Sequence, residues 1–288
     1  MIEMVLSPRD KDVRSGLSDA PGWSAFVAEL KDTLLVVMEA NEVDFLEIGE
    51  LLVGQPPSEG NSLLRNGFRV RREQVLDLVV GMVDGRGPYC QLSSPEGLSV
   101  TAGWDGATHL SMPREVAGGL AGFAGDHLVV EWRPASPEPP DESRLVRDPS
   151  DEEFWTAVRT AAAEEEMALL CERWAYGAYG VRWFRLTPGN ITQVAGSVSP
   201  RSLISVVVNP DLRLKVEILD DGFTAFKSPL CPGELTFRSY PDGADRLEEV
   251  TGEGYSFLLG DSMLYRWRAV VPDPDGEVRG LWEDYGLD

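Results

Sequence analysis

Near the middle of this 288-residue chain, the stretch Pro134–Ser150 (PASPEPPDESRLVRDPS) separates two segments that are rich in regularly spaced apolar residues. Proline has no backbone donor, fixes its own φ angle and restricts the residue before it, so such a run favours an extended linker. The chain also exceeds the roughly 100–200 residues of a usual domain. We therefore predict two domains, residues 1–135 and 151–288, joined by a proline-rich acidic linker at residues 136–150.

The N-terminal half begins with helical periodicity. Apolar residues recur every three or four positions from Trp23 to Ala40, which predicts an amphipathic helix. Val43–Val53 is predicted as a shorter helix, and Arg72–Val83 as a third, although its β-branched residues also permit a strand. Short alternating runs then predict strands at Tyr89–Leu92, Leu98–Gly103, Ala107–Met112 and Leu128–Trp132.

The C-terminal half repeats this order, with a helix followed by strands. Ser150 and Glu153 have the spacing of a capping box, and we predict a helix from Asp151 to about Tyr176 that ends at Gly177 and Gly180. The strands predicted after it are Val181–Leu186, Leu203–Val208, Leu212–Leu219, Phe223–Lys227, Glu234–Tyr240, Tyr255–Leu259 and Met263–Val271.

Three short matches occur in the same order in both halves. Leu98–Pro113 aligns without gaps with Leu214–Pro229, with six identical residues in sixteen. A Trp-(Ser/Thr)-Ala triplet precedes each match, and a Gly-Asp, apolar run, Trp-Arg pattern follows each. We therefore predict an α+β fold made by tandem duplication of a helix-plus-antiparallel-sheet domain. The Asp-Gly pair in each aligned segment predicts a hairpin tip, because both residues tolerate the positive φ angles of a tight turn.

The charge of the chain limits the classes of partner. It has 48 Asp and Glu against 26 Lys and Arg, which gives a formal net charge of −22. Such a field repels the phosphates of nucleic acids and of anionic lipids, so we expect binding to neither nucleic acid nor membrane. The cationic cluster Arg65, Arg69, Arg71 and Arg72 fits a solvated helix start as well as it fits a binding patch. Solubility alone is the alternative explanation of the acidity.

Cysteine content and hydropathy indicate the compartment. Three widely spaced cysteines, Cys90, Cys171 and Cys231, form neither a disulfide framework nor a pair with zinc-ligand spacing. The N-terminal sequence lacks the apolar core of a signal peptide, and no later stretch approaches the ~20 apolar residues of a membrane span. We therefore expect a soluble cytoplasmic protein.

The sequence has no motif with a known chemical mechanism. His109 and His127 lie at predicted strands, where a partly exposed, non-catalytic role is the simpler interpretation. A nucleophile elbow, a P-loop and a dinucleotide fingerprint are all missing. Asp273–Glu277 fits a tight turn better than a calcium loop, because its glycine comes too early. We expect no metal, no cofactor and no catalytic residue.

In general character the chain resembles the immunity proteins of bacterial polymorphic toxin systems. The features that carry the resemblance are the amphipathic first helix, the meander of short strands, the Trp104–Gly106 hairpin and the high acidity. This resemblance implies a cytoplasmic inhibitor that binds a cognate toxin enzyme and blocks its active site. An acidic surface suits that role, because toxins that degrade nucleic acids have basic substrate clefts.

Two other classes of protein remain open. One is an enzyme with a carboxylate-based site between the two repeats. The other is a duplicated scaffold or regulatory module, which requires an exposed apolar patch. We favour a protein-binding protein because no catalytic constellation is recognisable. The residues predicted to contact the partner are the two hairpin tips and two tyrosines from the aromatic segment Cys171–Arg185: Trp104, Asp105, Asp220, Asp221, Tyr176 and Tyr179.

Overall fold

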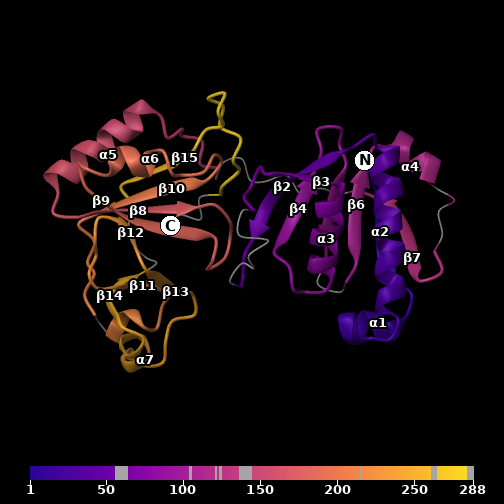
Figure 1. Cartoon of the computed structure of the whole chain (residues 1–288), viewed down its shortest axis with the longest axis horizontal. Helices are drawn as coiled ribbons and strands as arrows, with labels where there is room; N and C mark the ends of the chain where they lie inside the picture. The colour runs from indigo at the N-terminus through magenta and orange to yellow at the C-terminus, as the bar shows by residue number, and fades with distance from the viewer. Residues whose placement is uncertain are drawn as a thin grey trace. The chain divides into compact units, whose positions relative to one another are not determined.

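The computed structural model describes residues 1–55, 64–103, 106–120, 122, 125–135, 145–214, 216–260 and 265–283. The chain divides into an N-terminal unit, Met1–Glu138, and a C-terminal unit, Pro139–Asp288. Figure 1 draws the elements of both units. Each unit combines helices with antiparallel strands, so the predicted α+β class is confirmed. Within the described ranges, no helix has the length and hydropathy to cross a membrane.

The N-terminal unit contains one seven-stranded sheet. Its strands are β1 (Ile2–Pro8), β2 (Phe45–Leu52), β3 (Arg69–Arg71), β4 (Tyr89–Ser93), β5 (Ser99–Ala102), β6 (Thr108–Met112) and β7 (Leu128–Pro134). Its helices are α1 (Lys11–Gly16), α2 (Trp23–Ala40), α3 (Arg72–Val83) and α4 (Arg114–Leu120), with a 3-10 turn η1 (Leu17–Asp19). The strand order is β3-β2-β4-β5-β6-β1-β7, antiparallel throughout, and α2 and α3 lie on the same side of the sheet (Figure 1).

Burial separates the two faces of this sheet. Along β6, Leu110 and Met112 are buried whereas His109 and Ser111 are partly exposed, because successive side chains of a strand point to opposite faces. Burying a leucine side chain away from water stabilises the folded state by about 1.5–3 kcal/mol. The buried stripe of α2 is the one that its periodicity predicts: Phe26, Leu30, Leu34, Val37 and Met38. One face of the sheet and the helices therefore form the core, and partly exposed polar residues occupy the other face.

The C-terminal unit contains two sheets. The larger has the order β12-β9-β8-β10-β15 and the smaller the order β13-β11-β14. The strands are β8 (Ala168–Arg173), β9 (Val181–Leu186), β10 (Leu203–Val208), β11 (Phe223–Lys227), β12 (Gly233–Glu234), β13 (Phe237–Tyr240), β14 (Tyr255–Gly260) and β15 (Trp267–Val270). The helices are α5 (Glu152–Glu164), α6 (Ile191–Ala195) and α7 (Leu247–Gly252), with a 3-10 turn η4 (Val216–Ile218). Helices α5 and α6 lie on one side of the larger sheet and the smaller sheet lies on the other (Figure 1).

The larger sheet is buried on both faces. On the helix side, Leu170 of β8 packs with Val158 of α5. On the other side, Leu169 packs with Trp183 of β9 and Phe226 of β11, and the Trp183 and Phe226 rings meet edge to face with centroids 5.4 Å apart. Leu169 and Leu170 are both 0% exposed, so two separate cores meet at β8.

One predicted helix is wrong and another is too long, while the helix predicted at Arg72–Val83 is confirmed as α3. Val43–Val53 contains strand β2, which pairs with β3 and β4. The predicted helix from Asp151 to Tyr176 ends at Glu164, and β8 follows it. Because β8 is covered on both faces, its continuous apolar run lacks the period-2 alternation by which strands are recognised. The N-cap of α5 is Asp151 rather than Ser150, since the Asp151 carboxylate accepts from the Phe154 backbone amide at 3.0 Å.

The predicted alignment of the two halves is also wrong, and the predicted tandem duplication is not shown. Strands β5 and β6 pair as a hairpin, whereas the segment aligned with them, Leu214–Pro229, contains turn η4 and strand β11. Strand β11 pairs with β13 on one edge and β14 on the other. No edge of β11 is left for residues 212–219, so the strand predicted there and the hairpin tip at Asp220 and Asp221 do not form.

The two units nevertheless share one arrangement of elements. Both contain a helix, an antiparallel hairpin, a second helix and a strand, namely α2-β2-β3-α3-β4 and α5-β8-β9-α6-β10. The strand orders correspond as well, β3-β2-β4-β5 against β9-β8-β10-β15. In this comparison β5 corresponds to β15, and β11 to β14 are an insertion between β10 and β15.

A fully buried carboxylate stabilises the helix side of the larger sheet. Glu172 of β8 is 0% exposed. Its Oε2 accepts from Arg182 Nε of β9 at 2.9 Å and from a second guanidinium nitrogen. Its Oε1 accepts from the Ser199 amide at 2.7 Å and the Ser202 hydroxyl at 3.0 Å. Arg182 also donates to the Ser197 carbonyl, so these bonds fix the segment between α6 and β10 to the hairpin.

We expect Glu172→Ala to destabilise the protein by about 3 kcal/mol, because it leaves the partly buried Arg182 guanidinium and the Ser202 hydroxyl without their acceptor. Urea unfolding followed by circular dichroism measures this free energy. The control is Glu166→Gln, at an exposed position outside the network, which we expect to change stability by less than about 0.5 kcal/mol. Equal effects of the two substitutions would contradict the structural role of Glu172.

Candidate functional site

A pocket of about 400 Å³ lies in the C-terminal unit, between the two sheets. One wall is the face of the larger sheet that points away from α5 and α6. The opposite wall comes from β11, from β13 and from the residue after β13, and the turn between β8 and β9 also lines the pocket. The lining residues are Cys171, Arg173, Tyr176, Gly177, Ala178, Val181, Trp183, Leu203, Ser205, Thr224, Ser239, Pro241, Tyr265, Arg268 and Glu283.

The strand register places four of these residues in one row across the sheet. Trp183 lies opposite Cys171, Cys171 opposite Ser205, and Ser205 opposite Arg268. Paired residues in neighbouring strands point to the same face. Arg173, two residues after Cys171, points to this face as well. The pocket wall therefore follows from strand pairing, and a one-residue shift would replace it with residues of the helix-side core.

Two hydroxyl groups face the pocket without a hydrogen-bond partner among the described residues. Ser205 and Thr224 are only 6% and 5% exposed. In the part of the chain that the structure describes, the enclosed side-chain atoms with no partner are Thr108 Oγ1 and Tyr240 OH. The Ser205 and Thr224 hydroxyls are not among them and are therefore accessible from the pocket. Polar groups in such a position are available to a ligand.

The pocket is cationic although the chain as a whole is acidic. Arg173 and Arg268 line it, and the Arg268 guanidinium lies over the Tyr265 ring, 4.6 Å from its centroid. Arg173 is exposed and has no ion-pair partner within the described residues. Glu283 is the one carboxylate among the described lining residues. Two guanidinium groups and one carboxylate give the described lining residues a net positive charge.

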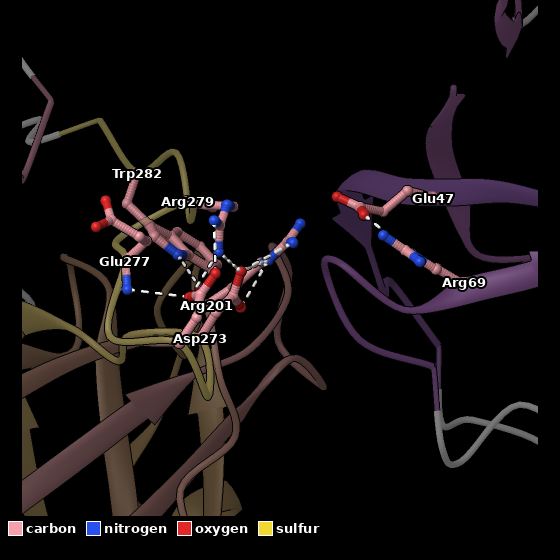
Figure 2. Close-up of polar contacts among 8 residues, drawn as sticks. Glu47, Arg69, Arg201, Asp273, Glu277, Arg279 and Trp282 are labelled. Atoms are coloured by element: carbon pink, nitrogen blue, oxygen red, sulfur yellow. Dashed lines mark hydrogen bonds and ion pairs between the residues drawn. The ribbon is translucent and has the colours of Figure 1, made fainter. Parts of the chain in front are cut away.

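The C-terminal segment closes one side of this pocket and is held by a network of arginine bonds (Figure 2). Trp282 donates its indole N–H to the Arg201 carbonyl at 2.7 Å. Arg201 Nε donates to Asp273 at 3.0 Å, and Arg279 donates to the same carboxylate at 2.9 Å. The Trp282 ring packs against Tyr176 with centroids 5.0 Å apart. These contacts place Glu283 and Tyr176 at the pocket.

Asp273 begins the tight turn that the sequence predicts at Asp273–Glu277. Gly276 donates to the Asp273 carbonyl at 2.8 Å and has a φ of 88°, which glycine adopts readily. Burial of the Asp273 carboxylate acts to raise its pKa, but the hydrogen bonds from Arg201 and Arg279 outweigh burial and lower it. Arg279 also lowers the pKa of Asp275 to about 2. In the described ranges, no group of acidic, histidine or cysteine side chains could hold a metal ion.

The predicted contact residues occupy different surroundings. Tyr176 lines the pocket, and Tyr179, in the same turn, is 44% exposed. Asp220 and Asp221 are exposed in the turn before β11, not at a hairpin tip. Trp104 and Asp105 lie outside the described residues, although β5 and β6 on either side of them do pair as predicted.

Sequence analysis missed the residues that give the pocket its polarity, namely Arg173, Ser205, Thr224 and Arg268. One feature of the sequence did indicate the pocket. The segment Cys171–Arg185 stands out for its aromatic and arginine content. Three of its residues, Arg173, Tyr176 and Trp183, line the pocket. Reading β8 as a helix concealed the fact that Cys171, Arg173 and Trp183 share one face.

A second polar cluster lies on the partly exposed sheet face of the N-terminal unit. Glu3 of β1 accepts from Arg133 of β7, and its second oxygen lies 3.1 Å from His109 Nδ1 of β6. The hydrogen bond from Arg133 is the main cause of a lowered pKa for Glu3. The cationic cluster of the sequence also has partners in this unit, since Arg69 pairs with Glu47 (Figure 2) and Arg72 with Asp44.

Comparison with known proteins gives no assignment of this site. No protein-family model, curated protein or solved structure matches the chain.

We expect Asp273→Asn to lower the free energy of unfolding by about 1 to 2 kcal/mol at pH 7, because two charge-assisted hydrogen bonds weaken. The folded-state pKa of Asp273 is lowered, so its stabilising effect is present above the ordinary aspartate pKa near 3.9 and is lost as the pH falls through the folded-state value. The difference between wild type and variant should therefore shrink below about pH 4. Urea unfolding from pH 7 to pH 2.5 measures it.

Asp242→Asn is the matched control, because Asp242 is exposed and has no ion-pair partner within the described residues. It should change stability little at any of these pH values. A gap between wild type and Asp273→Asn that keeps its size at pH 3 would contradict the role given to the arginine bonds.

Proposed function

We propose that this chain is a cytoplasmic protein-binding protein that acts as an immunity protein, binding a basic toxin enzyme and blocking its active site. The observation that carries the proposal is a pair of adjacent turns in the C-terminal unit whose carboxylates have no cationic partner among the described residues. We call them the acidic turn pair, made of Asp220, Asp221, Asp242 and Asp245.

Backbone contacts hold the two turns together. The Ala244 amide donates to the Leu219 carbonyl at 3.0 Å, and a Cβ on Gly243 would meet that carbonyl at 2.2 Å and the Asp221 carbonyl at 3.3 Å. Gly243 also has a φ of 76°. A residue with a side chain would force the turns apart, so glycine at this position allows four like charges to gather on one surface.

Apolar residues are exposed next to this charge. Val216 is 65% exposed and Leu214 is 40% exposed, and both precede Asp220 in the same connection between β10 and β11. Protein interfaces combine an apolar centre with a polar rim. Unpaired carboxylates attract a basic surface over several ångströms and raise the rate of association. Exposed apolar groups and unpaired carboxylates together favour a basic protein as the partner.

The enzyme alternative has less support. A carboxylate that works as a general acid needs a raised pKa. Glu3, Glu165, Asp273 and Asp275 have lowered pKa values, each because of hydrogen bonds from arginine or other donors. A scaffold protein would also use the exposed apolar residues, so the identity of the partner is what distinguishes the scaffold alternative from the immunity proposal.

The test uses the product of the open reading frame that adjoins the gene for this chain, purified with the full chain. We expect a stable complex that inhibits the enzymatic activity of that product. The association rate should fall steeply with salt, since the Debye length shortens from about 10 Å at 0.1 M to about 3 Å at 1 M. Stopped-flow fluorescence measures the rate.

The double variant D220N/D221N and the double variant D242N/D245N should each slow association by about tenfold at low salt. The control E39Q/E42Q removes the same charge from exposed positions in the N-terminal unit and should leave the rate within about twofold. Failure to form a complex would refute the proposed function. A complex with equal rates for all three variants would refute the assignment of the acidic turn pair as its contact surface.

A further inference from the structure

We infer that the pocket between the two sheets of the C-terminal unit is a binding site for a compact organic anion, with a carboxylate or phosphate group attached to an aromatic or apolar body. This inference does not depend on the partner protein proposed above. The two sites share no residue, since none of the four aspartates of the acidic turn pair is among the described lining residues of the pocket.

The positions of the two arginines define where the anionic group binds. Arg173 lies opposite Leu203, and Arg268 lies opposite Ser205, two residues further along β10. The two arginines are therefore on the strands either side of β10 and offset by two residues, roughly 12 Å apart at their backbones by the usual strand spacing and rise. Their side chains are long enough to converge on one group above β10. Guanidinium binds carboxylate and phosphate through paired hydrogen bonds, which makes these two groups the favoured ligands.

Hydroxyl groups complete the polar part of the site. Ser205 and Thr224 are almost fully buried, yet their hydroxyls have no partner in the described part of the chain and open into the pocket. A buried polar group without a partner costs free energy comparable to a lost hydrogen bond. An anion bound between the arginines would accept from the Ser205 hydroxyl beside Arg268. The site therefore offers donors from β8, β10, β11 and β15.

Aromatic rings define the rest of the ligand. Trp183 is in the same cross-strand row as Ser205 and is 3% exposed, with Phe226 packed against it edge to face. Tyr176, from the turn after β8, also lines the pocket. A volume of about 400 Å³ is near the lower end of the roughly 300–1,000 Å³ of ligand pockets, so it has room for a small ligand such as a single ring with one anionic substituent.

The experiment measures binding of three anions to the full chain by isothermal titration calorimetry: phenylacetate, phenyl phosphate and inorganic phosphate. Phenylacetamide is the neutral control. We expect at least one of the two aromatic anions to bind with a dissociation constant below about 1 mM. That anion should bind at least about tenfold more tightly than inorganic phosphate and phenylacetamide. Whichever of the carboxylate and the phosphate binds more tightly identifies the anionic group.

Variants then locate the site. Arg173→Gln should weaken binding by at least about tenfold, and Ser205→Ala by a smaller factor, because each removes one donor. Arg159→Gln is the matched control, since it removes the same charge from an exposed position on α5. It should leave the affinity unchanged. Arg268 is not the first choice, because its contact with Tyr265 means that its loss affects packing as well.

Dissociation constants above about 1 mM for both aromatic anions would overturn the inference, as would equal affinity in Arg173→Gln and the wild type. If phenylacetamide binds as tightly as the aromatic anions, the site does not require a negative charge. If inorganic phosphate binds as tightly, the site does not require an aromatic ring. Either result would overturn that part of the inference. None of these outcomes involves the partner protein, so they leave the immunity proposal to its own test.

Discussion

The C-terminal unit depends on the burial of one strand, β8, from both sides. Leu169 and Leu170 are adjacent in sequence and both fully buried, which is possible only if separate layers cover the two faces of the sheet. Helices α5 and α6 supply one layer, and the sheet of β11, β13 and β14 supplies the other. The second layer is a small sheet whose Phe226 packs against Trp183, and the pocket lies between the two sheets along the row of residues from Trp183 to Arg268.

A polar group buried next to β8 needs a hydrogen-bond partner, and the two faces of the sheet differ in what supplies that partner. On the helix side, Glu172 receives donors from Arg182, Ser199 and Ser202, so its charge is matched within the protein. On the pocket side, Arg173 has no ion-pair partner and the Ser205 hydroxyl has no hydrogen-bond partner among the described residues. Buried polar networks in native proteins are normally complete. The incomplete side is therefore the one expected to take a ligand, and the complete side is expected to stabilise the sheet.

Sequence analysis recovered helix α2, whose apolar stripe is visible because solvent covers the opposite face. It also recovered β9, β10, β11 and β14, although β10 and β11 are buried on both faces, because each is a short run rich in β-branched or aromatic residues. It fails where tertiary contacts override local pattern. The apolar run of β8 follows α5 with no glycine or proline between them, so the pattern predicts a continuous helix. The pattern also predicts a strand at residues 212–219, although β11 has no free edge for it. Strand β1 was not predicted at all. The site was predicted only through its aromatic segment, since its arginines and hydroxyls come together by pairing between strands that are distant in sequence.

The net charge of −22 has different consequences for the two binding surfaces. At the acidic turn pair it adds to the local field, so attraction of a basic partner extends over roughly a Debye length and weakens with salt. At the pocket it opposes the local field, because the surrounding carboxylates repel an incoming anion while the arginines attract it. The long-range barrier lowers the association rate of anions, but it changes the equilibrium less once the anion is within hydrogen-bond distance of Arg173 in a partly enclosed site. Raising the salt concentration should therefore weaken protein binding at the first surface while speeding the entry of anions at the second, so the two sites are distinguished by opposite responses of their association rates to salt.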